Sequence, residues 1–133
     1  MTHEELRALA TRYAEAWSSQ DPQNLAAHYT EDGVLVVNSG TPAVGRAQIA
    51  AKAQEFMEAF PDMVVSMESV ELDGSSAVFH WRWTGTNTGP GGKGRSVDLR
   101  GHEAWTLDSE GLISESKGHY DEAEYERQMS GVA

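Results

Sequence analysis

The sequence predicts an α+β fold in which three N-terminal helices pack on a curved, mostly antiparallel sheet and a short helix follows at the C-terminus. In the first half of the chain, apolar residues recur at helical spacing. In the second half, long segments alternate apolar and polar residues, as strands with one buried face do. Helices must cover that apolar face. A curved sheet wrapped on helices forms a cone with an internal pocket, where we expect the function to lie.

Three helices are predicted before residue 61. Thr2 and Glu5 form a capping box at the start of the first. Asp21-Pro22 is typical of a helix N-terminus. Pro61 stops the third helix. The predicted helices are His3–Ser18, Pro22 to about Thr30, and Arg46–Phe60.

Five strands follow from the patterns in the rest of the chain. Asp32-Gly33 and Asp73-Gly74 are predicted turns, and residues 38–44 are a predicted loop. The second long hairpin closes at residues 108–111. The predicted strands are Val34–Val37, Met63–Leu72, Ser76–Asn87, Val97–Leu107 and Leu112 to about Tyr120, followed by a helix over Glu122–Ser130.

Glu103 is the strongest functional signal in the sequence. It shares the apolar face of its strand with Leu99 and Trp105, because alternate residues point to the same side. A carboxylate on such a face is costly unless it is protonated, paired or open to a wet cavity. Two readings follow: an acid facing the pocket, which we favour, or a structural ion pair with an arginine.

Composition narrows the class of protein. The chain of 133 residues is long enough for one domain, 1–133, with a core of its own. Its formal charge of −11 disfavours nucleic acid as a partner. It has no apolar run long enough for a membrane span and no basic-then-apolar N-terminus, so we expect a cytoplasmic protein that binds no membrane. The lack of cysteine excludes disulfides and thiolate metal sites but leaves the compartment open. His80 and His102 are expected to pair with Asp98 or Glu68 rather than bind a metal.

Several short segments, spread over nearly the whole chain, carry a family resemblance. With this order of elements, the chain resembles the SnoaL-like polyketide cyclases and ketosteroid isomerases of the nuclear transport factor 2 superfamily. The resemblance implies a cone-shaped α+β fold, a small apolar organic ligand, no cofactor, and a homodimer formed through the outer sheet face. The segments are Arg12-Tyr13, Ala16-Trp17, Asp21, residues 28–32, Gly45-Arg46, residues 60–63, residues 85–89 and residues 108–113.

The resemblance also implies roles for single residues. Tyr13 and Glu103 match the two donors that stabilise the substrate oxyanion in ketosteroid isomerases, and Tyr29 matches a supporting tyrosine. The general base of those isomerases falls on Val37, and the aspartate base of the cyclases falls on Gly118. Neither residue accepts a proton.

Two functions therefore remain open. One is a cofactor-free isomerase or cyclase that acts on a small apolar carbonyl compound, with His28, water bound to Asn38, or Asp121 as the base. The other is a non-catalytic module for binding a hydrophobic ligand or for dimerisation. Large aromatic residues are more often core than catalytic. The candidate catalytic residues are Tyr13, Glu103, Asp121 and His28, and the candidate substrate-binding residues are Trp17, Tyr29, Asn38, Phe56, Phe60, Phe79, Trp81, Trp83, Leu99, Trp105 and Tyr120.

Overall fold

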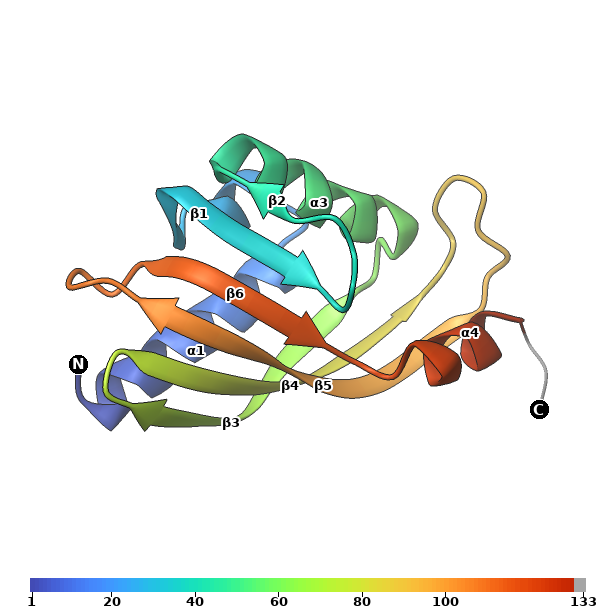
Figure 1. Cartoon of the computed structure of the whole chain (residues 1–133). Helices are drawn as coiled ribbons and strands as arrows, with labels where there is room; N and C mark the ends of the chain where they lie inside the picture. Colours follow the sequence, from blue (N-terminus) through green and yellow to red (C-terminus); the bar gives the residue numbers. More distant parts are fainter. Residues whose placement is uncertain (131–133) are drawn as a thin grey trace.

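The structure, a computed structural model, describes residues 1–130 and has the predicted α+β class, with four helices and one six-stranded sheet (Figure 1). The strand order is β2-β1-β6-β5-β4-β3. Strands β1 and β6 pair in parallel, and every other neighbouring pair is antiparallel. The elements are α1 (His3–Ser18), α2 (Pro22–Ala26), β1 (Tyr29–Val37), β2 (Ala43–Val44), α3 (Arg46–Ala59), β3 (Val64–Asp73), β4 (Ser76–Thr86), β5 (Ser96–Leu107), β6 (Ile113–His119) and α4 (Glu122–Ser130).

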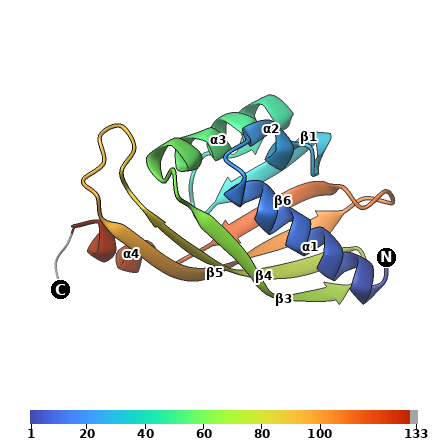
Figure 2. The same cartoon turned by 180° about the vertical axis from the view of Figure 1, so that it is seen from behind.

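The three N-terminal helices lie on one face of the curved sheet. Figure 2 shows α1 running across that face, with α2 and α3 beside the end where β1 lies. Buried apolar residues from the helices and from alternate strand positions form one cluster between these two layers. The opposite face of the sheet is left open along β3 to β6 (Figure 1). Among residues 1–130, none of the helices has the length and apolar character needed to cross a membrane.

Helix α1 begins and faces inward as its sequence predicts. The Thr2 hydroxyl accepts a hydrogen bond from the Glu5 backbone N–H at 3.1 Å, and the Glu5 carboxylate accepts one from the Thr2 N–H at 2.9 Å. This reciprocal pair confirms the capping box. Tyr13, fully buried, then lies on the face turned to the sheet.

Three predictions around the first strand are wrong. Helix α2 ends at Ala26 rather than near Thr30, and β1 already begins at Tyr29. Asp32 and Gly33 lie inside β1, at a register shift in its pairing with β6, and do not form a turn that precedes it. Part of the predicted loop also pairs with β1 as the short strand β2. At Asp32-Gly33, pairing of β1 with the distant strand β6 overrides the local turn signal.

Candidate functional site

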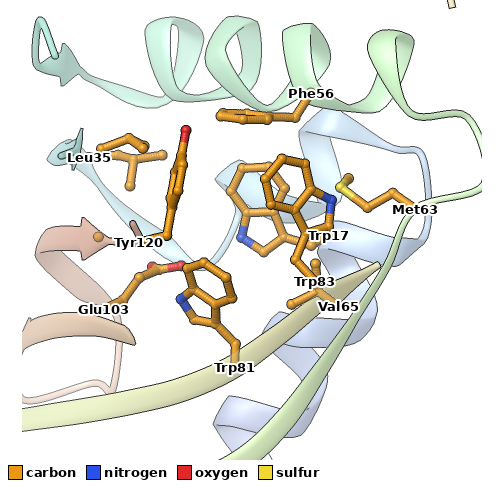
Figure 3. Close-up of a pocket in the computed structure, with 11 residues that line it drawn as sticks. Trp17, Leu35, Phe56, Met63, Val65, Trp81, Trp83, Glu103 and Tyr120 are labelled. Carbon is orange, nitrogen blue, oxygen red and sulfur yellow. The ribbon is translucent and has the colours of Figure 1, made fainter. Parts of the chain in front are cut away.

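A cavity of about 60 Å³ lies between the sheet and the helices. Its walls come from α1, α3, the segment that enters β3, and strands β1, β4, β5 and β6. Nearly all of its surface is apolar, and Figure 3 shows most of the side chains that enclose it. The lining residues are Trp17, Leu35, Val37, Phe56, Met63, Val65, Trp81, Trp83, Glu103, Gly118 and Tyr120.

Five aromatic rings enclose most of this cavity, and neighbouring rings stand steeply to one another. Phe56 meets Trp17 at 5.9 Å between centroids and Trp83 at 5.7 Å, with interplanar angles of 81° and 88°. Tyr120 meets Trp83 at 6.0 Å and Trp81 at 6.4 Å, with angles of 69° and 63°. Edge-to-face contacts of this kind are favourable and hold the rings in fixed orientations.

Two of these rings reach the cavity because alternate residues of a β-strand point to the same face of the sheet. Trp81 and Trp83 lie on the same face of β4, two residues apart. Trp81 fits across β5 because its neighbour there is Gly101: a Cβ on Gly101 would lie 2.5 Å from the Trp81 ring and 2.4 Å from the His119 carbonyl oxygen. A glycine at this position is therefore required for the wall to form.

Glu103 supplies a carboxyl group to the cavity. Three donors converge on its Oε1 atom: the Ser116 hydroxyl at 2.6 Å, the Tyr13 hydroxyl at 2.8 Å and the Trp105 indole N–H at 3.1 Å. Within residues 1–130, its other oxygen, Oε2, has no hydrogen-bond partner. Because Glu103 lines the cavity and Oε1 is saturated, Oε2 is the oxygen that remains available to a ligand.

A chain of hydroxyl groups leads from the core to Glu103. The Tyr13 and Tyr29 hydroxyl oxygens are 2.7 Å apart. Since Tyr13 has a single O–H and donates it to Glu103, Tyr29 donates to Tyr13. Both tyrosines are fully buried, and Tyr13 is not part of the cavity wall. Tyr13 therefore holds the Glu103 carboxyl group from behind the cavity wall.

Burial controls the ionisation of this group of residues. Desolvation raises the pKa of the Glu103 carboxyl, although the hydrogen bonds from Ser116, Trp105 and Tyr13 partly offset the effect. Desolvation, followed by the nearby Glu103 charge, raises the pKa of Tyr13 and of Tyr29 well above its ordinary value. The cavity wall holds no lysine, arginine or histidine, and Glu103 has no ion-pair partner among residues 1–130.

The structure brings some predicted site residues to the cavity and leaves others away from it. Trp17, Phe56, Trp81, Trp83, Glu103 and Tyr120 line it. Behind this wall lie large buried side chains that belong to the core: Tyr13, Tyr29, Phe60, Phe79, Leu99 and Trp105.

The three predicted alternatives for a base do not line the cavity. The Asp121 carboxylate is exposed and accepts a hydrogen bond from the Glu124 N–H at 3.1 Å, at the start of α4. The His28 ring nitrogen Nδ1 lies 3.0 Å from the Asn24 carbonyl oxygen, and burial lowers the pKa of His28. Asn38, with φ of 51°, accepts a hydrogen bond from the Tyr120 N–H at 3.0 Å and so holds the backbone of a wall residue.

Sequence reasoning missed five residues of the wall as ligand contacts. Leu35 and Val37 alternate along β1, and Met63 and Val65 alternate where the chain enters β3. That alternation was the available signal. Gly118 shows no such pattern, because a glycine has no preference for a face of the sheet, and only the family resemblance, which puts a general base there and at Val37, pointed to it.

Cross-strand pairing places Gly118 and Val37, two of these five residues, in one row with Glu103. Gly118 on β6 pairs with Val37 on one side and with Glu103 on the other. The three residues form a row across β1, β6 and β5, and all line the cavity. Of the two positions at which the family resemblance puts a general base, Gly118 is the direct neighbour of Glu103 and Val37 lies one strand further away, and neither carries a carboxylate.

The histidines of the outer sheet face pair differently from the prediction. His80 binds Glu71, with 2.7 Å between Nε2 and Oε1. The two carboxylates predicted as its partners bind arginines instead: Asp98 pairs with Arg82 at 2.7 Å, and Glu68 with Arg100 at 2.9 Å. Guanidinium groups bind carboxylates with better geometry than imidazole does. Over residues 1–130, no three His, Asp or Glu side chains are arranged to hold a metal ion.

Comparison with solved structures shows which proteins share this fold. A protein from Jannaschia sp. CCS1, described as a SnoaL-like polyketide cyclase, is 22% identical, with 98% of this chain and 94% of that chain covered at a TM-score of 0.81. A protein from Catenulispora acidiphila with a ketosteroid isomerase-like fold, solved with trimethylamine, is 17% identical, with 92% of each chain covered and a TM-score of 0.81.

A phenazine biosynthesis-related protein from Pseudomonas aeruginosa is 17% identical, with 97% of this chain and 92% of that chain covered and a TM-score of 0.74. At these identities the likeness is one of fold. Comparison with curated proteins gives no match. The SnoaL-like domain model matches residues 10–116, which is most of the chain. The chain therefore belongs to the SnoaL-like domain family, and its cone-shaped fold is that of the nuclear transport factor 2 superfamily.

Proposed function

We propose that the cavity binds a small, largely apolar carbonyl compound and that Glu103 forms the hydrogen bond to its oxygen. The observation that carries this proposal is that the two oxygens of the Glu103 carboxyl group differ in their hydrogen bonds. Oε1 accepts three hydrogen bonds, so a proton on the protonated acid resides on Oε2. An O–H group on the cavity side is a donor for a carbonyl oxygen, and the apolar wall suits the rest of such a molecule.

This arrangement supports acid–base chemistry of the isomerase or cyclase type. A raised carboxyl pKa brings Glu103 closer to the pH at which an acid can also serve as a base. Since Val37 and Gly118 supply no second carboxylate, Glu103 is the one carboxyl group on the wall. In its ionised form, Oε2 takes the proton from the carbon next to the carbonyl group and, now protonated, returns a proton to the enolate, so that the same group serves first as base and then as acid. Tyr13, Ser116 and Trp105 stabilise the anion that remains when it gives the proton up.

The test is proton exchange on a small ketone. Cyclopentanone is incubated with the protein in D₂O, and loss of its α-protons is followed by NMR. We expect exchange above the protein-free rate, and loss of that excess in Glu103→Gln. Glu110→Gln, which removes the same charge from the exposed β5–β6 turn, is the matched control. Binding without exchange supports the alternative of a non-catalytic ligand-binding module, and the absence of binding contradicts the proposal.

We also propose that two copies of the chain associate through the outer face of the sheet. On this face Val78 is surrounded by positively and negatively charged side chains, which include the ion pairs Arg82–Asp98 and Arg100–Glu68. A mixed face of this kind is complementary to a second copy of itself across a two-fold axis. The sheet face opposite the cavity is thereby covered without closing the ligand site.

A further inference from the structure

Three of the five histidines of the chain form a row across the outer face of the sheet. His80 on β4 is the cross-strand partner of His102 on β5, and His102 is the partner of His119 on β6. The imidazole centroids of His80 and His102 are 6.0 Å apart, and those of His102 and His119 are 5.1 Å apart. The histidine row lies on the face opposite the cavity, because Trp81 and Glu103, which follow two of these histidines in their strands, line the cavity.

The histidine row lies in the middle of the sheet face that we propose as the interface between two copies. His102 is near the centre of β5 (Ser96–Leu107), and β5 lies between β4 and β6 in the sheet. In a two-fold contact the same patch meets itself, so side chains near its centre face their counterparts in the second copy. Association through this face therefore brings two histidine rows together and removes water from both.

The acidic side chains around the histidine row are already engaged. Glu71 on β3 lies 2.7 Å from His80, whereas His102 and His119 have no carboxylate partner among residues 1–130. The cationic side chains beside the row, on β4, β5 and β6, each pair with a carboxylate, so neutral histidines leave this face close to charge balance. These ion pairs are Arg82–Asp98, Arg100–Glu68 and Lys117–Glu115.

Protonation of the histidine row adds positive charges that have no partner on this face. A charged His102 stands between two other imidazole rings and two residues from Arg100 on the same face of β5. In the single chain, partial burial, followed by the charges of His119 and His80, already lowers the pKa of His102. A second copy that removes more water lowers this pKa further, so the separated copies bind protons more readily than the dimer does.

We propose that mild acid separates the two copies, because His102 and His119 take up protons that the interface between the copies does not accommodate. This regulation rests on the association through the outer sheet face proposed above. The association is at full strength above the pKa of the histidines in the separated copies, about 6.5 for an ordinary imidazole, and weakens as the pH falls below it. Acid also makes the overall charge of −11 less negative, which by itself favours association. Weakening in acid therefore runs against the trend of the whole molecule.

The experiment measures the dissociation constant of the dimer by analytical ultracentrifugation at about pH 8 and about pH 5.5, on either side of the ordinary histidine pKa. We expect dissociation to be at least about tenfold more favourable at the lower pH, since a single pKa that falls by one unit on association changes the constant up to about tenfold. Equal or tighter association in acid would overturn the pH dependence and leave the association in place. A monomer at both pH values would contradict both proposals.

Variants then assign the effect to the histidine row. His102→Gln combined with His119→Gln keeps two polar side chains that cannot become charged, and most of the pH dependence should be lost. The matched control is His3→Gln combined with His28→Gln, because His3 contacts the Val70 carbonyl oxygen and His28 contacts the Tyr13 ring, away from the outer face. The control should keep the pH dependence of the wild type. An unchanged pH dependence in the first variant would show that other groups cause it and would contradict the proposal.

Titration of the histidines by NMR gives a second measurement on the wild-type protein. The pKa of His102 should be lower at a protein concentration at which the dimer predominates than after dilution to the monomer, because only the dimer removes further water from the ring. The pKa of His3 should be the same at both concentrations. Equal pKa values for His102 in the two samples would overturn the proposal, whatever the variants show.

Discussion

Val37 and Gly118 are paired across the parallel strands β1 and β6, and both line the cavity. They are the positions at which ketosteroid isomerases and SnoaL-like cyclases, respectively, are expected to carry the general base. Gly118 is also the cross-strand partner of Glu103 on β5. A Cβ added to Gly118 would lie 3.4 Å from Glu103 Cγ. Glu103 is therefore the one carboxylate on this wall.

The first prediction is that the protein does not isomerise β,γ-unsaturated ketosteroids at an appreciable rate. A positioned base contributes about a hundred- to ten-thousand-fold to such a reaction, and Val37 cannot supply it. The cavity of about 60 Å³ is also too small to enclose a steroid. The assay follows the conjugated-enone absorbance with a standard steroid substrate, and robust turnover by the wild type would show that another acid reaches the cavity.

The second prediction restores a base with Val37→Asp. With 3-cyclopentenone, which is far smaller than a steroid, as the substrate, we expect at least about a hundredfold increase in isomerisation over the wild type. Val36→Asp is the matched control, because the neighbouring residue of a strand points to the opposite face. Equal gains from both variants would mean that the rate does not depend on the cavity.

The third prediction concerns the charge of Glu103. Burial raises its pKa in the folded state above that in the unfolded state. Its contribution to the free energy of unfolding is then fully present below the unfolded pKa and is lost as pH rises through the folded pKa. Glu103→Gln should therefore be at least as stable as the wild type near neutral pH. The difference in the free energy of unfolding between variant and wild type should shift in favour of the variant from acidic to neutral pH. Denaturant unfolding at both pH values measures this, and clear destabilisation by the variant at neutral pH would show that Glu103 is ionised and stabilised there.

The fourth prediction separates the two buried tyrosines. Tyr13→Phe removes a donor from Glu103 Oε1 and also leaves the Tyr29 hydroxyl without its partner, so we expect a cost of about 1–3 kcal/mol in the free energy of unfolding. Tyr29→Phe leaves the bond from Tyr13 to Glu103 in place and should cost less. A larger loss from Tyr29→Phe would contradict the direction assigned to the hydroxyl chain.

The fifth prediction concerns the association of two copies. We expect light scattering at micromolar concentration to give the mass of a dimer, and a charge reversal on the outer face, Arg100→Glu, to shift the equilibrium toward the monomer. The cavity residues lie on the other side of the sheet, so ligand binding should survive this change. A monomer under these conditions would count against association through the sheet face.

The sequence by itself determined the elements whose signals are local. The capping box at Thr2 starts α1 where predicted, Pro61 follows the end of α3, and alternation along β4 puts Trp81 and Trp83 on one face. Alternation along β5 likewise placed Glu103 among apolar residues. These features depend on neighbours within a few positions, and the chain shows them wherever it packs.

Only the tertiary structure decided where β1 begins and what surrounds Glu103. β1 extends back to Tyr29 because it pairs with β6, some eighty residues away in the sequence, and no local pattern encodes that partner. Oε1 receives hydrogen bonds from Tyr13 on α1 and Ser116 on β6, while Oε2 is left for the cavity. A residue's burial, hydrogen-bond partners and protonation depend on which distant segments meet around it, and these are settled only when the helices close over the sheet.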